Sequence, residues 1–193
     1  MSLLYAITGR WDRVLFFLQG HVPLLQLRFK DQSLVGETSR LKAIVQEFPQ
    51  TRIIINDDPD IAASCGAWGV HLGQEDLAGY RVEDLMGLPC HLGISTHNWT
   101  EIEHAQSFSP AYLGFGPIFP TSTKQVKALP QTVSQLAQVV SQCKLPIVAI
   151  GGIQPSNWQA VIEVNPFAIA MISALETVQD LSELRQWQTQ LES

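Results

Sequence analysis

The chain has 193 residues, of which 46% are hydrophobic and 16% are charged, and its formal net charge at pH 7 is −6. These values predict one globular domain over residues 1–193, and an acidic balance without a basic tract argues against nucleic acid as a partner. No apolar run approaches the roughly 20 residues of a transmembrane helix. Because Arg10, Asp12 and Arg13 around Trp11 also interrupt any signal-peptide core, we expect a cytoplasmic protein without a membrane partner.

The three cysteines are Cys65, Cys90 and Cys143. They are odd in number, widely spaced and without a CxxC pattern, which argues against a disulfide framework and against a zinc site. We therefore expect ordinary thiols in a reducing compartment. The sequence leaves the oligomeric state open, a homo-oligomer included.

Short runs rich in Val, Ile and Leu alternate with amphipathic segments along the whole chain. The expected strands are residues 3–8, 24–29, 52–56, 69–73, 91–95, 112–116, 147–150 and 167–172. The expected helices are residues 12–19, 34–48, 61–65, 82–86, 100–106, 132–142, 156–164 and 181–191, with Ser156 capping the helix that it begins.

The continuity of the apolar runs is typical of parallel strands that are buried on both faces. Strict alternation of strand and helix over about 200 residues predicts a closed (β/α)8 barrel, the TIM barrel, of the α/β class. A doubly wound open sheet is the alternative. It needs a G-x-G-x-x-G loop after the first strand, and the sequence there is Thr8-Gly9-Arg10-Trp11.

In a barrel of this kind the chemistry lies at the carboxyl ends of the strands. The second strand ends with Gln26, Arg28 and Lys30, which alternation places on one face. Two cations and an amide on a buried strand are costly unless they meet an anion. Solvation at the strand end is the alternative, and it suits Lys30 better than Gln26.

Carboxylates follow the next two strands, in Asn56-Asp57-Asp58 and at Asp76. Oxygen ligands at neighbouring strand ends suit Mg²⁺, which binds through one or two carboxylates together with phosphate oxygens and water. The alternative is that these aspartates cap the helices that follow. The cations of the second strand favour the metal, because Mg²⁺ with cations is a way to hold a diphosphate.

Hydroxyls and glycines follow the last three strands. Pro117 and Pro120 end the sixth strand, and the strand-end residues after it and after the seventh and eighth strands are Thr121, Ser122, Thr123, Lys124, Gly152, Ile172 and Ser173. Backbone N–H groups and a helix N-terminus at this place form the usual phosphate site of such barrels. A solvated Ser/Thr loop is the alternative.

The fifth strand ends Ser95-Thr96-His97. A nucleophile with its base is one interpretation of this pair, but no acid is placed to orient His97 and strand neighbours point to opposite faces. We therefore expect Ser95 to form hydrogen bonds to a ligand. We expect His71 to be a structural histidine at a strand end.

Seven segments together carry a resemblance. They are QLRFK at 26–30, INDD at 55–58, GVHLGQED at 69–76, GISTH at 93–97, GFGPIFPTSTK at 114–124, VAIGGI at 148–153 and MISA at 171–174. In this order they resemble the thiamine-phosphate synthase family and its relative, the thiazole tautomerase. The resemblance implies a (β/α)8 barrel that joins hydroxymethylpyrimidine diphosphate to thiazole phosphate, releases pyrophosphate and requires Mg²⁺.

The resemblance also implies roles for single residues. The pyrimidine diphosphate would be bound by Gln26, Arg28, Lys30, Asn56, Ser95 and Lys124, of which Arg28, Ser95 and Lys124 would be catalytic. Asp57 and Asp76 would hold Mg²⁺. The thiazole phosphate would be bound by Thr121, Ser122, Thr123, Gly152, Ile172 and Ser173.

The chain departs from the family pattern at three places, one of which is a first helix that is shorter than usual. Ile7-Thr8-Gly9 stands where the family usually has Ile-Thr-Asp, and residues 125–130 replace a Gly-rich stretch. Two alternatives to the synthase therefore stay open. One is a tautomerase that uses His97 as its acid–base residue, and the other is a phosphate-binding barrel that has lost turnover.

Overall fold

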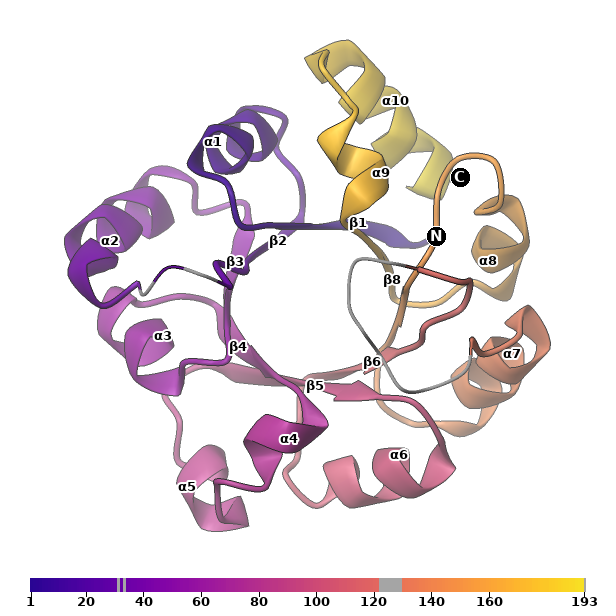
Figure 1. Ribbon diagram of the computed structural model, residues 1–193, viewed down its shortest axis with the longest axis horizontal. Helices are drawn as coiled ribbons and strands as arrows, with labels where there is room; N and C mark the ends of the chain where they lie inside the picture. Colours follow the sequence, from indigo (N-terminus) through magenta and orange to yellow (C-terminus); the bar gives the residue numbers. More distant parts are fainter. Residues whose placement is uncertain (31, 33, 122–129, 193) are drawn as a thin grey trace.

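The computed structural model describes residues 1–30, 32, 34–121 and 130–192. Its strands form a closed parallel barrel in which each strand pairs with the next and β8 pairs with β1 (Figure 1). The strands are β1 (Leu3–Thr8), β2 (Leu24–Leu27), β3 (Arg52–Asn56), β4 (Gly69–Leu72), β5 (His91–Thr96), β6 (Tyr112–Phe115), β7 (Ile147–Ile150) and β8 (Ala168–Met171). The predicted (β/α)8 barrel is confirmed.

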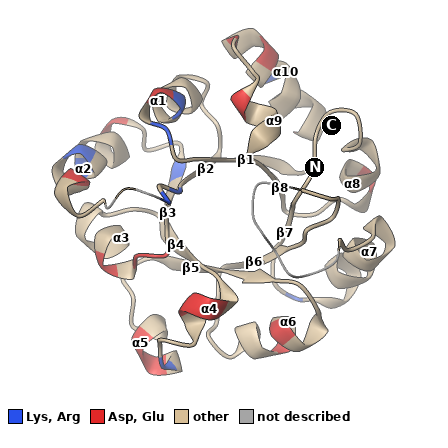
Figure 2. Ribbon diagram, in the orientation of Figure 1, with Lys and Arg blue, Asp and Glu red and all other residues tan. Residues whose placement is uncertain are grey.

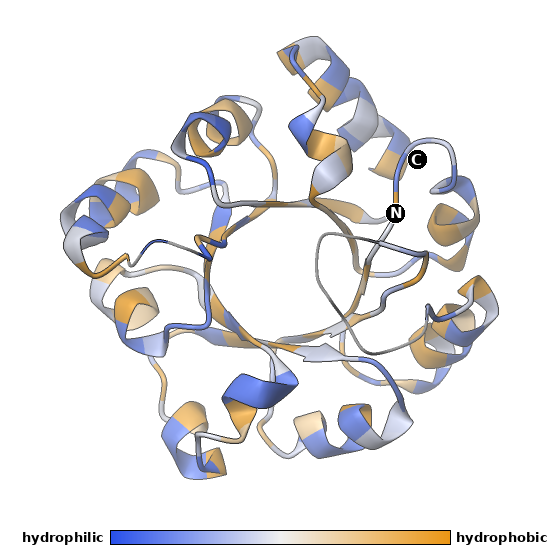
Figure 3. Cartoon of the chain, viewed as in Figure 1, coloured by the Kyte–Doolittle hydropathy of each residue, from blue (hydrophilic) through white to orange (hydrophobic). Residues whose placement is uncertain are grey.

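The helices surround the barrel and carry both hydrophobic and hydrophilic residues (Figures 1 and 3). They are α1 (Trp11–Gln19), η1 (Val35–Glu37), α2 (Thr38–Glu47), α3 (Pro59–Cys65), α4 (Gln74–Leu77), α5 (Val82–Met86), α6 (Trp99–Gln106), α7 (Val133–Gln142), α8 (Gln159–Val164), α9 (Ser173–Glu176) and α10 (Leu181–Glu192). The short helices α4 and α9 follow the carboxyl ends of β4 and β8 directly. Among the described residues, none of the helices has the length and apolar character needed to cross a membrane.

The helix predicted at residues 156–164 begins three residues later than expected, as α8 (Gln159–Val164). The prediction that Ser156 caps this helix is wrong, because α8 starts at Gln159 and the residue at its N-cap position is Trp158. Residues 154–158 form a turn instead, in which Asn157 accepts a 2.9 Å hydrogen bond from the backbone N–H of Gln154. This local side-chain bond competes with the first turn of the helix.

Alternation along the strands divides the core in two. One set of buried side chains packs between the strands and the helices, and Leu4 and Ala6 of β1 belong to it. The other set fills the barrel and consists of Tyr5, Ile7, Leu24, Ile54, Tyr112, Val148, Ala168 and Ala170. Leu3, Trp68, Ala111 and Phe167, which begin or precede strands, pack against this inner set. The amino ends of the strands are thus filled, which leaves the carboxyl ends for a ligand.

Candidate active site

A cavity of about 680 Å³ opens at the carboxyl ends of the strands, and residues from all eight strands or their following loops line it. The predicted site residues that line it are Gln26, Arg28, Asn56, Asp57, Asp76, Ser95, Thr121, Gly152, Ile172 and Ser173. Lys30 is exposed and does not line the cavity, because β2 ends at Leu27 and strand alternation stops before it. Ser122, Thr123 and Lys124 lie outside the described residues.

The ends of β2, β3 and β4 bring charged side chains together. Acidic residues follow β3 and occupy α4, and basic residues follow β2 (Figure 2). Partial loss of water, then the charge of Asp76 and a hydrogen bond to it, raise the pKa of the Asp57 carboxyl, while Arg28 opposes this. Burial lowers the pKa of Arg28, and Asp57 and Asp76 oppose that shift. The two carboxylates expected to hold Mg²⁺ are therefore neighbours, with one guanidinium beside them.

The alternative that aspartates cap helices holds for two of the three residues. Asp58 caps α3 by accepting a 2.8 Å hydrogen bond from the N–H of Ile61, and it does not line the cavity. Asp76 accepts a 2.8 Å hydrogen bond from the N–H of Gly73 and also faces Asp57. Asp57 adopts the left-handed conformation with φ 63°, and its N–H donates to the carbonyl of His71 on β4.

No group of three or more His, Cys, Asp or Glu residues is arranged for a metal ion in the part of the chain that the structure describes. A carboxylate pair alone suits Mg²⁺, which takes its remaining ligands from substrate phosphate and water. Burial first, and then the neighbouring carboxylate of Asp76, raise the pKa of Asp57, and a divalent cation held by both carboxylates would relieve their mutual repulsion. The donor set therefore fits Mg²⁺.

The loops after β6 and β7 are joined to each other by backbone hydrogen bonds. Ile118 donates to the carbonyl of Ile150 at 3.0 Å, and Phe119 donates to that of Gly151 at 2.9 Å. Gly152 has φ 66°, and a Cβ there would lie 2.5 Å from the carbonyl oxygen of Pro120. Only glycine allows this approach, which brings the loop that precedes Thr121 against Gly152 at the cavity wall.

His97 has an acidic partner, which corrects the expectation that no acid is placed to orient it. Nδ1 of His97 lies 2.7 Å from Oε2 of Glu101, and the backbone N–H of His97 donates to the same oxygen at 2.8 Å. Because Asn98 caps α6, the first turn of the helix brings Glu101 back over His97. A capping Asn followed three residues later by Glu is a signal that the sequence contains. His97 also lines the cavity, so it does not turn away from it.

His71 does more than end a strand. It lines the cavity and lies between Ser95 and Tyr112, with Nε2 2.8 Å from Oγ of Ser95 and Nδ1 2.9 Å from the phenol oxygen of Tyr112. Sequence reasoning missed Tyr5 and Tyr112 as cavity residues, because tyrosines within apolar strands resemble ordinary core. It also missed Gln74, whose side-chain amide donates a 2.6 Å hydrogen bond to the carbonyl of Ser95.

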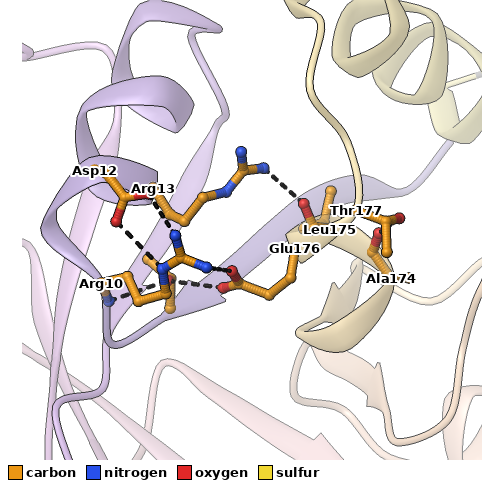
Figure 4. Close-up of polar contacts among 8 residues, drawn as sticks. Arg10, Asp12, Arg13, Ala174, Leu175, Glu176 and Thr177 are labelled. Atoms are coloured by element: carbon orange, nitrogen blue, oxygen red, sulfur yellow. Dashed lines mark hydrogen bonds and ion pairs between the residues drawn. The ribbon is translucent and has the colours of Figure 1, made fainter.

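Beside the cavity, a set of polar contacts joins α1 to α9 (Figure 4). Arg10 pairs with Asp12 at 2.7 Å and with Glu176 at 3.3 Å. Thr8 donates a 3.1 Å hydrogen bond to Glu176, and Arg13 donates a 2.6 Å hydrogen bond to the carbonyl of Leu175. The residues after β1, where the chain departs from the family pattern, thus hold the helix that begins at Ser173.

Comparisons with known proteins agree with this geometry. A family model described as thiamine monophosphate synthase (TMP-TENI) matches residues 4–175. A thiamine-phosphate synthase of Lawsonia intracellularis is 36% identical over 88% of this chain and 81% of the relative. One of Shouchella clausii is 36% identical over 88% of this chain and 82% of the relative. The solved thiamine phosphate pyrophosphorylase of Pyrococcus furiosus superposes with a TM-score of 0.83 at 27% identity, covering 98% of this chain and 94% of that one. Because the family model spans most of the chain and both curated relatives are 36% identical to it, the chain belongs to the thiamine monophosphate synthase family.

Proposed function

We propose that this chain is a thiamine-phosphate synthase, a transferase that joins hydroxymethylpyrimidine diphosphate to thiazole phosphate and releases pyrophosphate. The observation that carries the proposal is the division of one cavity into two chemically different walls. The wall from β2 to β4 holds the carboxylate pair and Arg28. The wall from β6 to β8 holds glycine backbone and hydroxyl groups. A cavity with these walls accepts two phosphorylated substrates side by side.

The first wall suits the diphosphate. In the proposal Arg28 and Asn56 bind its oxygens, Gln26 and Ser95 bind nearby, and Lys30 and Lys124 add positive charge. Asp57 and Asp76 would hold Mg²⁺, which would neutralise charge on the diphosphate. The second wall suits the thiazole phosphate, through Thr121, Ser122, Thr123, Gly152, Ile172 and Ser173.

The reaction proposed is dissociative. The bond between the pyrimidine methylene carbon and the diphosphate oxygen breaks, the aminopyrimidine stabilises the resulting cation, and the thiazole nitrogen then bonds to that carbon. The chain contributes by holding the two substrates in line and by placing Arg28 and Lys124 against the negative charge of the leaving group. No side-chain nucleophile is required. Such a reaction, with the acidic net charge, suits a cytoplasmic enzyme whose partners are small phosphorylated molecules rather than nucleic acid.

One observation favours a second candidate function. The hydrogen bond between His97 and Glu101 at the cavity wall is the arrangement of a general base held by a carboxylate. A thiazole tautomerase would use such a group to move a proton on thiazole phosphate. The carboxylate pair, which a tautomerase does not need, supports the synthase over this candidate.

One assay separates these possibilities. The purified chain is incubated with hydroxymethylpyrimidine diphosphate and thiazole phosphate, with and without Mg²⁺. We expect thiamine phosphate and pyrophosphate in equal amounts, and only with Mg²⁺. Isomerisation of the thiazole phosphate without the pyrimidine would support the tautomerase. Binding of both substrates without any product would support a barrel that has lost turnover, and either result would overturn the proposal.

A further inference from the structure

A continuous chain of hydrogen bonds runs from the cavity wall into the barrel. Ser95 bonds to Nε2 of His71 at 2.8 Å and Nδ1 of His71 to the phenol oxygen of Tyr112 at 2.9 Å. The phenol oxygens of Tyr112 and Tyr5 are 2.8 Å apart. At the far end, the side-chain amide nitrogen of Gln26 donates to Tyr5 at 2.8 Å. Five side chains from five strands or strand ends thus form one line.

The surrounding packing fixes these groups. Tyr5 and Tyr112 are each 1% exposed, and their rings meet edge to face with centroids 6.0 Å apart. The rings of His71 and Tyr112 stack with centroids 5.6 Å apart. A Cβ at position 93 would lie 2.4 Å from the phenol oxygen of Tyr112, so Gly93 on β5 leaves the space that this phenol occupies.

The number of protons sets the direction of every bond in the line. An amide nitrogen only donates, so Tyr5 accepts from Gln26 and has one proton left, which it donates to Tyr112. Tyr112 then donates its own single proton to Nδ1 of His71. Burial raises the pKa of both phenols, which keeps both protons in place.

Because Nδ1 of His71 accepts the proton of Tyr112, the ring proton of His71 lies on Nε2 and is donated to Oγ of Ser95. We propose that His71 and Tyr112 are positioning residues, which hold Oγ of Ser95 as an acceptor on its inner side so that its own proton is donated to the anion in the cavity. Ser95 is then a hydrogen-bond donor of fixed direction rather than a freely rotating hydroxyl. This inference rests on the proposed function for the identity of the anion, the diphosphate.

The tautomer of His71 is the first test, and it does not depend on activity. Correlation spectra between ring nitrogen-15 and carbon-bound protons distinguish Nε2–H from Nδ1–H, and His71→Gln assigns the signal among the five histidines. We expect Nε2–H in the metal-free wild type. An Nδ1–H signal would mean that the Gln26 amide faces the other way and every bond in the line is reversed, which overturns the proposal.

A double-mutant cycle is the second test. Tyr112→Phe keeps the ring and removes the phenol oxygen, so Nδ1 loses its donor and the tautomer of His71 is no longer fixed. We expect a mixture of tautomers and a kcat about tenfold lower, the scale of one hydrogen bond, with the KM for thiazole phosphate unchanged. In a Ser95→Ala background the same change should cost nothing more.

A full tenfold loss in the Ser95→Ala background would show that Tyr112 acts by another route, and would overturn the proposal. Failure of this inference and of the proposed function are distinguishable. Nε2–H in a chain that makes no thiamine phosphate refutes the function alone, whereas Nδ1–H in an active synthase refutes the positioning role alone. Thermal unfolding of each variant checks that the barrel is intact.

Discussion

The backbone N–H of Gly73 donates a 2.8 Å hydrogen bond to Oδ2 of Asp76, the same side chain that faces Asp57 across the ends of β3 and β4. Asp76 therefore stabilises the start of α4 and also supplies negative charge to the cavity. An amide oxygen can replace the first role but not the second. Replacing Asp76 with asparagine therefore removes the charge and keeps the cap, so that the two effects can be measured separately.

Asp76→Asn is expected to abolish Mg²⁺-dependent activity with little change in thermal stability, because asparagine still accepts a hydrogen bond from Gly73. Asp76→Ala should lose the cap as well, about 1 kcal/mol of stability. Calorimetric titration with Mg²⁺ and thermal unfolding measure the two effects. Asp84→Asn is the matched control, since Asp84 makes the same contact with Arg81 at the start of α5, outside the cavity. Unchanged Mg²⁺ affinity in Asp76→Asn would contradict the metal assignment.

Asp57 is expected to make the metal-free protein less stable at neutral pH. The pKa of Asp57 is higher in the folded protein than in the unfolded chain, where it is about 3.9. Ionised Asp57 therefore lowers the free energy of unfolding by its full amount when the pH is above the folded-state pKa. This penalty disappears as the pH falls below the pKa of the unfolded chain. Asp57→Asn should therefore raise the melting temperature of the metal-free protein at pH 7. The part of this gain that comes from charge should shrink as the pH falls toward 4, whereas any benefit of asparagine at φ 63° is independent of pH.

Adding Mg²⁺ should reverse this difference, so that the wild type melts at a higher temperature than Asp57→Asn. A metal ion that binds the folded state stabilises it, and Asp57→Asn has lost one of the two carboxylates expected to bind the ion. Melting curves over pH with and without Mg²⁺ provide the measurement. A gain for Asp57→Asn that stays constant from pH 7 to pH 4 would show that charge is not the cause.

Gly152→Ala is expected to weaken binding of thiazole phosphate. The new Cβ would lie 2.5 Å from the carbonyl oxygen of Pro120, in a backbone conformation with φ 66°, and such strain costs about 1–3 kcal/mol. The loop before Thr121 must then move away from the wall. We expect a KM for thiazole phosphate that is higher by tenfold or more, with a smaller effect on the pyrimidine substrate. Gly36→Ala is the control, since no atom of the described residues lies within 4 Å of its added Cβ.

Arg28→Ala should lower kcat/KM by about 2–4 kcal/mol of transition-state free energy, the scale of one preorganised charge partner. Arg28 is half-buried at the cavity wall beside Asp57 and Asp76, so its charge is weakly screened. The same loss is expected for Lys124→Ala. Arg81→Ala, which removes an exposed charge at the N-cap of α5, should leave kcat/KM unchanged. An Arg28→Ala variant with the rate of the wild type at saturating substrate would refute the role of Arg28.

The sequence predicted the barrel because its strands are continuous apolar runs, and it placed Gln26, Arg28, Asp57 and Ser95 at the cavity because strand ends meet at one rim. Contacts that depend on a turn of helix were not visible in strand patterns. Glu101 reaches His97 only because α6 begins at the cavity rim. Tyr5 and Tyr112 could not be recognised as polar cavity residues for another reason. In the sequence they alternate with apolar neighbours as ordinary core residues do, and only the fold brings their phenol oxygens together.

The last prediction concerns His97 and Ser95, and it separates the synthase from the tautomerase. In a synthase the leaving pyrophosphate can take up protons itself, so no protein base is needed for bond formation. His97→Asn should then keep most of the turnover, although Glu101 loses its imidazole partner. Ser95→Ala should lose far more, because it removes the donor that His71 holds against the anion. A tautomerase would show the reverse order, since its proton transfer depends on a group that titrates near neutrality and contributes roughly 10²–10⁴-fold.

Glu101→Gln extends this comparison, because an amide keeps the hydrogen-bonding shape while removing the charge that holds His97. Its synthase activity should follow that of His97→Asn and stay near the wild type. All three variants are measured in both reactions, with thiamine phosphate and the isomerised thiazole phosphate quantified separately. Collapse of synthase turnover in His97→Asn and Glu101→Gln, with Ser95→Ala near normal, would assign the chemistry to the His97–Glu101 pair. The cavity would then be the site of a proton transfer, with the carboxylate pair at β3 and β4 having no part in it.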